Sequence, residues 1–328
     1  MPTFCRHNRL IQNCPICSRE QAIELRPVIS SSAPRSSQSR TGSPRSTPSR
    51  AVAPRQGPSG GLKVRRLRRG ADDGYHSPLV PGLKSSAEAA RLAEELAFAA
   101  GRLARLREDP PGLYAEVAGD SDVEEATWLA FLIAYLGPLD DEDPFAEIAR
   151  VRTSWSSGAD PVLEDIRTGP RSVHDPGRGT RTLEAYRAWA RRAGSQAAAF
   201  TGEPAWTPER RFARTFERLA LPGLHRDARF DLLVTVGALG VYELDAGTLV
   251  LGGDNQVTLA AKRALGIGDP LLLERRASEL AQASAVPRAA LDLGLYNWER
   301  GERTRAGVDA DPDAEAQALE STRAALRL

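Results

Sequence analysis

Residues 121–138 read SDVEEATWLAFLIAYLGP, and this stretch decides the fold class. From Trp128 to Leu136 every side chain is apolar or aromatic, so a helix over 122–136 would be hydrophobic nearly all round. Gly137 and Pro138 follow at once and end it. A helix of this kind is expected at the centre of a helical domain, where neighbouring helices cover every face.

Helical periodicity continues on both sides of this segment. Upstream, apolar residues recur at helical spacing from Leu92 to Leu106, after a serine cap at Ser85 or Ser86. Neither an alternating strand pattern nor an internal repeat is visible, so the predicted fold is all-α. The last helix follows an acidic linker and is expected to dock loosely. Downstream, helices are predicted over 182–200, 207–220, 226–240, 254–265, 270–284, 286–296 and 312–327.

Charge is distributed unevenly along the 328 residues. Residues 1–70 contain 14 Lys/Arg and 2 Asp/Glu, whereas the remainder carries a net charge of −11. A basic arm of this kind indicates an anionic partner such as DNA. The chain is expected to divide into a cysteine-containing segment (1–26), a disordered Ser/Pro/Arg-rich linker (27–69), a helical domain (70–300) and an acidic linker with a C-terminal helix (301–328).

The cysteines lie close together in residues 5–17, CRHNRLIQNCPIC. Cys5, His7, Cys14 and Cys17 form a set of four soft ligands that suits a closed, structural Zn²⁺ site. The alternative is a reduced tail that binds no metal. Three cysteines within thirteen residues exclude a disulfide scaffold. The sequence has no signal-peptide core and no apolar run of about 20 residues. We therefore expect a cytoplasmic protein without a membrane partner, and association with the nucleoid is a candidate.

Residues 219–269 carry the strongest functional signal. They contain Leu221-Pro222-Gly223-Leu224-His225-Arg226, then Gly252-Gly253-Asp254-Asn255, then Arg263-Ala264-Leu265-Gly266. This arrangement resembles the helix-hairpin-helix DNA glycosylases, in which an LPG-type hairpin points backbone N–H groups at a DNA phosphate. The resemblance implies a catalytic role for Asp254. The hairpin residues Gly223, His225 and Arg226 are candidates for binding DNA phosphate, although His225 is equally suited to an ordinary turn. Lys262 and Arg263 lie about two helical turns after Asp254 and could hold DNA or pyrophosphate, while a solvated helix face is the commoner place for a residue such as Lys262.

The segment also departs from that pattern. His225 replaces the second hairpin glycine, and Asp227 stands where bifunctional glycosylases carry a Schiff-base lysine. Strand cleavage through a lysine imine is therefore not expected. Gly266-Ile267-Gly268 is an alternative hairpin. Asp254 also has an alternative interpretation, because a residue after Gly252-Gly253 is a suitable helix cap.

A closer resemblance extends over most of the body. Residues 72–106, 206–240 and 254–298 are similar to the α-glutamyl/putrescinyl thymine pyrophosphorylases of clade 3, regarded as relatives of the DNA glycosylases. The resemblance implies an enzyme that replaces pyrophosphate on 5-hydroxymethyluracil in DNA by an amine or amino acid. Two other functions are kept as alternatives: a monofunctional DNA glycosylase, and a non-catalytic, zinc-containing DNA-binding adaptor.

Three other groups of residues are candidates for a site. Asp73, Tyr75 and His76 combine an acid, an aromatic ring and an imidazole, and they either line a pocket or form a surface lead-in. The acidic run 140–143 could hold Mg²⁺ beside a pyrophosphate, although a solvated turn that caps the next helix is the commoner arrangement. Trp155 in a polar loop could stack on a base.

Overall fold

The computed structural model describes residues 70–328. In this range every regular element is a helix and none is a strand, which confirms the all-α prediction. The described residues all belong to one compact unit. No helix within them has the length and apolarity needed to cross a membrane. The four predicted zinc ligands and the predicted linker 27–69 lie outside the described residues.

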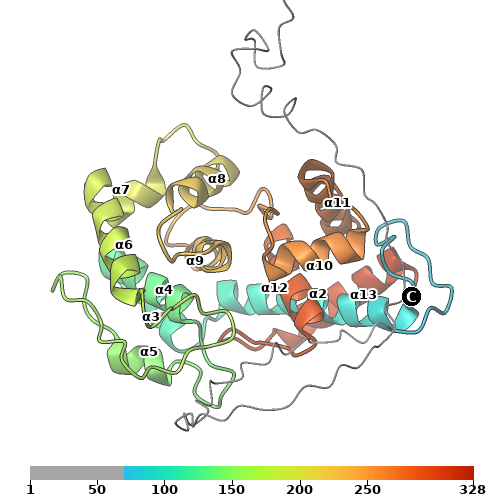
Figure 1. Ribbon diagram of the computed structural model, residues 1–328, viewed down its shortest axis with the longest axis horizontal. Helices are drawn as coiled ribbons and strands as arrows, with labels where there is room; N and C mark the ends of the chain where they lie inside the picture. The colour runs from blue at the N-terminus through green and yellow to red at the C-terminus, as the bar shows by residue number, and fades with distance from the viewer. Residues whose placement is uncertain (1–69) are drawn as a thin grey trace, which may run out of the picture. The chain divides into compact units, whose positions relative to one another are not determined.

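The helices form two lobes (Figure 1). The terminal lobe combines helices from both ends of the described chain: α2 (Ser86–Glu108), α10 (Gln256–Leu265), α11 (Pro270–Ala283), α12 (Arg288–Arg300) and α13 (Pro312–Leu326). The central lobe contains the intervening helices: α3 (Leu113–Gly119), α4 (Val123–Leu136), α5 (Ala146–Val151), α6 (Gly179–Ala193), α7 (Gln196–Thr201), α8 (Pro208–Arg218) and α9 (Arg226–Ala238). Helices α2 and α9 make contact where the lobes meet.

Helix α4 is the buried centre of its lobe, as its sequence predicted. The Asp122 side chain caps its start by accepting from the N–H of Glu124, and Gly137, at φ +68°, ends it. Helices α3, α7 and α9 pack around it. Phe131 is fully buried, and the ring of Tyr186 stacks on it with centroids 3.8 Å apart. Burial of large aromatic rings from both helices ties α6 to α4.

The polar loop between α5 and α6 is tied to α4 by Glu125. The Glu125 carboxylate accepts hydrogen bonds from the Ser154 hydroxyl and from the N–H groups of Trp155 and Ser156. Burial alone would raise the pKa of Glu125, but these hydrogen bonds lower it to about 2. The guanidinium of Arg187 lies over both the Trp128 ring and the neighbouring Trp155 ring. Trp155 is half-buried, and its ring packs against Arg187, Trp128 and Tyr186.

The last helix, α13, packs firmly along α2, so the expectation of loose docking was wrong. Gly101 allows the approach: a Cβ there would lie 2.8 Å from the carbonyl oxygen of Asp311. The N–H of Asp311 donates to the Gly101 carbonyl, and Leu326 is fully buried. Residues 301–328 therefore belong to the same compact unit as the helical domain before them.

Candidate nucleic-acid interface

The segment between α8 and α9 is a tight turn, which we call the LPG turn (Leu221–His225). Pro222 and Gly223 occupy its two central positions, and the N–H of Leu224 donates to the Leu221 carbonyl over 3.1 Å. Proline followed by a glycine of positive φ is typical of a type II turn, and Gly223 has φ +77°. A Cβ at this position would lie 2.1 Å from the Thr182 hydroxyl oxygen. Gly223 therefore allows the turn to lie directly against the first turn of α6.

Two helices begin at this point of contact. Helix α6 starts at Gly179 and helix α9 starts at Arg226, and no side chain caps either start. The first-turn N–H groups of both helices therefore lack a side-chain acceptor. Uncapped helix starts carry partial positive charge and favour anions.

Arginines reinforce this positive potential. A hollow of about 370 Å³ lies between the LPG turn and α6, and no carboxylate lines it. Arg178, whose side chain is 79% exposed, has Asp175 as its nearest acid, at 3.9 Å. Arg181 is exposed and makes no ion pair with any residue of the described range. The lining consists of Arg178, Arg181, Thr182, Pro222 and Gly223.

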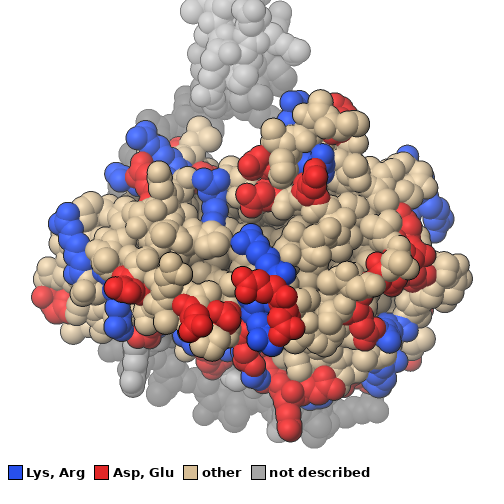
Figure 2. All heavy atoms as spheres, turned by 180° about the vertical axis from the view of Figure 1, so that it is seen from behind, with Lys and Arg blue, Asp and Glu red and all other residues tan. Residues whose placement is uncertain are grey.

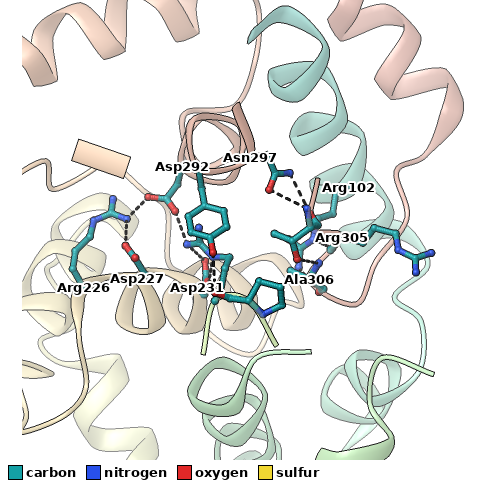
Figure 3. Close-up of polar contacts among 12 residues, drawn as sticks. Arg102, Arg226, Asp227, Asp231, Asp292, Asn297, Arg305 and Ala306 are labelled. Atoms are coloured by element: carbon teal, nitrogen blue, oxygen red, sulfur yellow. Dashed lines mark hydrogen bonds and ion pairs between the residues drawn. The ribbon is translucent and has the colours of Figure 1, made fainter. Parts of the chain in front are cut away.

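Beneath the turn, a buried charge cluster joins the two lobes (Figure 3). Arg226, the first residue of α9, points inward and pairs with Asp227 at 3.1 Å and with Asp292 of α12. Asp292 also accepts from the Arg171 Nη2 over 2.7 Å. Two further bonds, from the Arg171 Nε and Nη2 to the Asp231 carboxylate, complete the cluster. Asp292 is therefore shared between two arginines of the central lobe.

Burial makes these ion pairs strongly interdependent. The side chains of Arg171 and Asp292 are 3% and 2% exposed. Burial alone would lower the pKa of Arg171, but Asp231 and Asp292 raise it well above its ordinary value. The Arg171 guanidinium also lies over the Tyr296 ring, whose hydroxyl donates to the Pro170 carbonyl. Charges held in this way fix α9, and with it the LPG turn, against α12.

A second set of polar contacts continues from this cluster along the same boundary. Arg102 of α2 donates to the carbonyls of Arg305 and Ala306. Asn297 of α12 bonds both to the N–H and to the carbonyl of Thr304. Arg102, Arg171, Asp231 and Asp292 all line a cavity of about 40 Å³, which is large enough for ordered water.

The structure brings Gly223 and His225 together in the turn, but it separates them from the other predicted DNA contacts. His225 is exposed at the start of α9, whereas Arg226 is buried in the charge cluster. Arg263 is also engaged: it pairs with Glu88 and Glu299 at 2.8 and 2.7 Å and lies over the Trp298 ring. Both guanidiniums are neutralised within the protein.

Lys262 lies in a different hollow, in the terminal lobe. This hollow has a volume of about 600 Å³. Lys84 and Lys262 contribute positive charge to it, while Asp72 and Glu88 contribute negative charge. The alternative hairpin at 266–268 is the loop between α10 and α11, with Gly266 in the left-handed region.

Asp254 is exposed in the turn before α10. The predicted capping role belongs to its neighbour, since the Asn255 side chain accepts from the N–H of Thr258 over 2.9 Å. The Asp254 carboxylate makes no hydrogen bond or ion pair within residues 70–328. It lines neither the LPG-turn hollow, nor the Lys262 hollow, nor the buried cavity.

The other candidate residues have structural contacts. Asp73 caps α2 from a distance, and the hydrogen bonds that it accepts from Ser86 lower its pKa. The Tyr75 hydroxyl donates to the Leu326 carbonyl over 2.6 Å, and His76 is exposed. The lead-in to α2 therefore holds α2 and the end of α13 together, and these three side chains line none of the hollows described above.

The acidic run 140–143 is used in bonds to the protein. Asp140 accepts from the Thr304 hydroxyl, Asp141 pairs with Arg167, and Asp143 accepts from the N–H of Phe145. No group of three or more potential metal ligands occurs among the residues that the structure describes. The run therefore closes a turn, but it does not cap the next helix as predicted, because α5 (Ala146–Val151) starts at Phe145 without a side-chain cap.

No family model, curated protein or solved structure matches the chain. The function of the LPG turn must therefore be inferred from its own geometry and charges. The LPG motif did not indicate Arg178 and Arg181, which line the hollow beside the turn and contribute its positive charge. Residues 177–182, GRGTRT, carry a signal that could have shown them, because glycines, hydroxyls and arginines directly before a helix are typical of an anion-binding helix start.

Proposed function

We propose that the protein binds the phosphodiester backbone of DNA at the LPG turn. The observation that carries this proposal is the meeting of two uncapped helix starts, α6 and α9, beside Arg178 and Arg181. Backbone N–H groups and arginines are the usual donors to DNA phosphates. The resemblance of Leu221-Pro222-Gly223 to a DNA-binding hairpin supports the same assignment.

Duplex DNA fits this surface better than a single strand. Proteins that hold single strands without sequence preference stack bases on aromatic side chains. In residues 70–328, the large apolar side chains that are exposed are all aliphatic: Val162, Leu259, Leu271, Leu272 and Leu328. Recognition at the turn therefore depends on the phosphate backbone.

Replacing the two arginines tests the proposal. We expect the double variant Arg178→Gln/Arg181→Gln to bind duplex DNA roughly 10- to 100-fold more weakly, because two charge-assisted contacts are lost. The slope of log K against log salt should become shallower by about two, since each phosphate contact contributes about 0.9. Fluorescence anisotropy over a salt series measures both quantities in the full chain.

A matched control removes the same charge elsewhere. Arg107 and Arg327 are exposed and make no ion pair within the described range. Arg107→Gln/Arg327→Gln should therefore change affinity only through net charge. Equal effects of the two double variants would contradict a phosphate site at the turn.

A second candidate is catalysis on a base of the bound DNA, as the resemblance to the thymine pyrophosphorylases implies. Two carboxylates favour it: Asp227 and Asp231 lie in the first two turns of α9, with side chains 22% and 30% exposed. A carboxylate on the helix that begins at the LPG turn could stabilise a developing positive charge or activate an incoming amine. The proposal also includes a structural Zn²⁺ site at Cys5, His7, Cys14 and Cys17 and an amine or amino acid as co-substrate.

Mass spectrometry of nucleosides distinguishes the functions. Duplex DNA carrying 5-hydroxymethyluracil, free or pyrophosphorylated, is incubated with an amine pool and with wild type, Asp227→Asn or Asp254→Asn. If the second candidate is right, we expect a changed nucleoside with wild type and Asp254→Asn but not with Asp227→Asn. Free base with abasic sites would identify a glycosylase. DNA that is bound and unchanged would identify a non-catalytic adaptor.

A further inference from the structure

Most arginines of the body are paired with groups of the protein itself. On the face seen in Figure 2, blue and red side chains alternate over much of the surface. A minority of basic side chains in residues 70–328 make no ion pair, hydrogen bond or ring contact within that range. They are Lys84, Arg107, Arg181, Arg191, Arg192, Arg210, Lys262 and Arg327.

Three of these unpaired arginines lie on α6, the helix whose start adjoins the LPG turn. Arg181 lies in its first turn, and Arg191 and Arg192 lie in its last. All three side chains are exposed. Because 11 residues separate Arg181 from Arg192 and a helix rises 1.5 Å per residue, the two lie about 17 Å apart along the axis.

The face between them is suited to a close approach. Helical spacing places Ala185 and Ala188 on the same side as Arg181 and Arg192. Alanine side chains are short, so neither of them projects between Arg181 and Arg192. Glu184, the one acid in α6, is exposed beside this row on the flank toward Arg191. One strand of B-DNA carries a phosphate per 3.4 Å of axis, and about 17 Å therefore corresponds to roughly five base pairs.

Basic residues at a helix end also have an ordinary role, which is to interact with the last carbonyls. Here that role is not fulfilled by hydrogen bonding. Neither the Arg191 nor the Arg192 guanidinium bonds to a carbonyl at the end of α6, where Gly194 provides the cap instead. Their donors therefore remain available to an external anion.

We infer that α6 extends the DNA interface, with Arg191 and Arg192 contacting phosphates about five base pairs from those held at the LPG turn. This inference rests on the proposed function, because it takes the turn as the first point of contact. Its occupant is duplex DNA, since regularly spaced phosphates on a stiff backbone are what a straight helix face can meet at two distant points.

The test uses the full chain and two GC-rich duplexes. A long duplex of 20 base pairs can reach from the LPG turn to the end of α6. The short duplex is a hairpin with a stem of four base pairs, about 14 Å long, which can reach only one of the two. For Arg191→Gln/Arg192→Gln we expect the salt slope on the long duplex to fall by about two, with a loss of affinity of about tenfold or more. On the short duplex the change should be no larger than that of the control, Arg107→Gln/Arg327→Gln.

The outcomes separate this inference from the function on which it rests. If Arg178→Gln/Arg181→Gln weakens binding to both duplexes while Arg191→Gln/Arg192→Gln behaves like the control on both, the turn binds DNA and the extension along α6 is wrong. If wild type binds neither duplex, or the turn variant also behaves like the control, the proposed function and the extension fail together. Circular dichroism checks that all variants fold alike.

Discussion

Asp292→Ala is expected to lower the free energy of unfolding by about 3–5 kcal/mol, because it leaves buried arginines without their shared carboxylate. Arg171 and Arg226 both pair with Asp292, whose side chain is 2% exposed. Each arginine keeps one other acidic partner, Asp231 and Asp227 respectively. For a domain of this size, a change of this magnitude corresponds to a fall of roughly 10 °C in the melting temperature.

Urea denaturation followed by circular dichroism measures the effect. Asp292→Asn is the second variant, since it keeps the side-chain volume and removes the charge, and it should also be clearly destabilised. Asp309→Ala is the control: its carboxylate pairs with Arg305 at 3.3 Å but is 78% exposed. An exposed pair contributes about 0–1 kcal/mol. Equal unfolding free energies for Asp292→Ala and Asp309→Ala would show that the cluster does not hold the lobes together.

Gly223→Ala is expected to damage both stability and DNA binding. The φ of +77° costs a non-glycine residue about 1–2 kcal/mol, and the new Cβ would meet the Thr182 hydroxyl oxygen. Overpacking at such a contact adds about 1–3 kcal/mol. Because Thr182 is buried at the start of α6, we expect the clash to push the LPG turn away from α6, so that the two helix starts no longer meet and duplex affinity falls at least tenfold.

Gly240→Ala separates the backbone strain from the displacement of the turn. Gly240 follows the other end of α9 with a similar φ of +73°, and a Cβ there would meet nothing within 4 Å. This control should lose about 1–2 kcal/mol of stability and keep its DNA affinity. Affinity is measured at a temperature where thermal melts show every variant folded. Undiminished binding by Gly223→Ala under that condition would exclude the turn as the DNA contact.

Local signals in the sequence predicted most of the fold. The apolar run ending at Leu136 predicted the buried α4, and the predicted helix 270–284 is α11, where the Asp269 side chain accepts from the N–H of Leu272. These features depend on neighbouring residues only. The predicted helix 182–200 is in fact two helices, because Gly194 at φ +97° ends α6 and Ser195 caps α7. The short helices α3 and α5 are stabilised by packing and lack a periodic pattern long enough to recognise.

The candidate site was less predictable, because the partner of each charge is set by tertiary structure. Arg171 and Asp292 are 121 residues apart in the chain and 2.7 Å apart in the protein. Arg226 and Arg181 look equally available in the sequence, yet the first is buried in ion pairs and the second is free for a ligand. The LPG motif located the turn correctly. It did not indicate that α6, which precedes the turn by some forty residues, provides the neighbouring arginines.

The partnership of α2 with α12 and α13 has a consequence for how the protein is made. Helix α2 presents Leu92, Leu96, Leu103 and Leu106 to those late helices, and α12 begins about 180 residues after α2 ends. At a synthesis rate of 5–20 residues per second, the ribosome needs roughly ten to forty seconds to deliver the covering helices. The central lobe, made from one continuous stretch of chain, can fold during that interval. The apolar face of α2 therefore stays uncovered in the nascent chain until the last helices emerge from the ribosome.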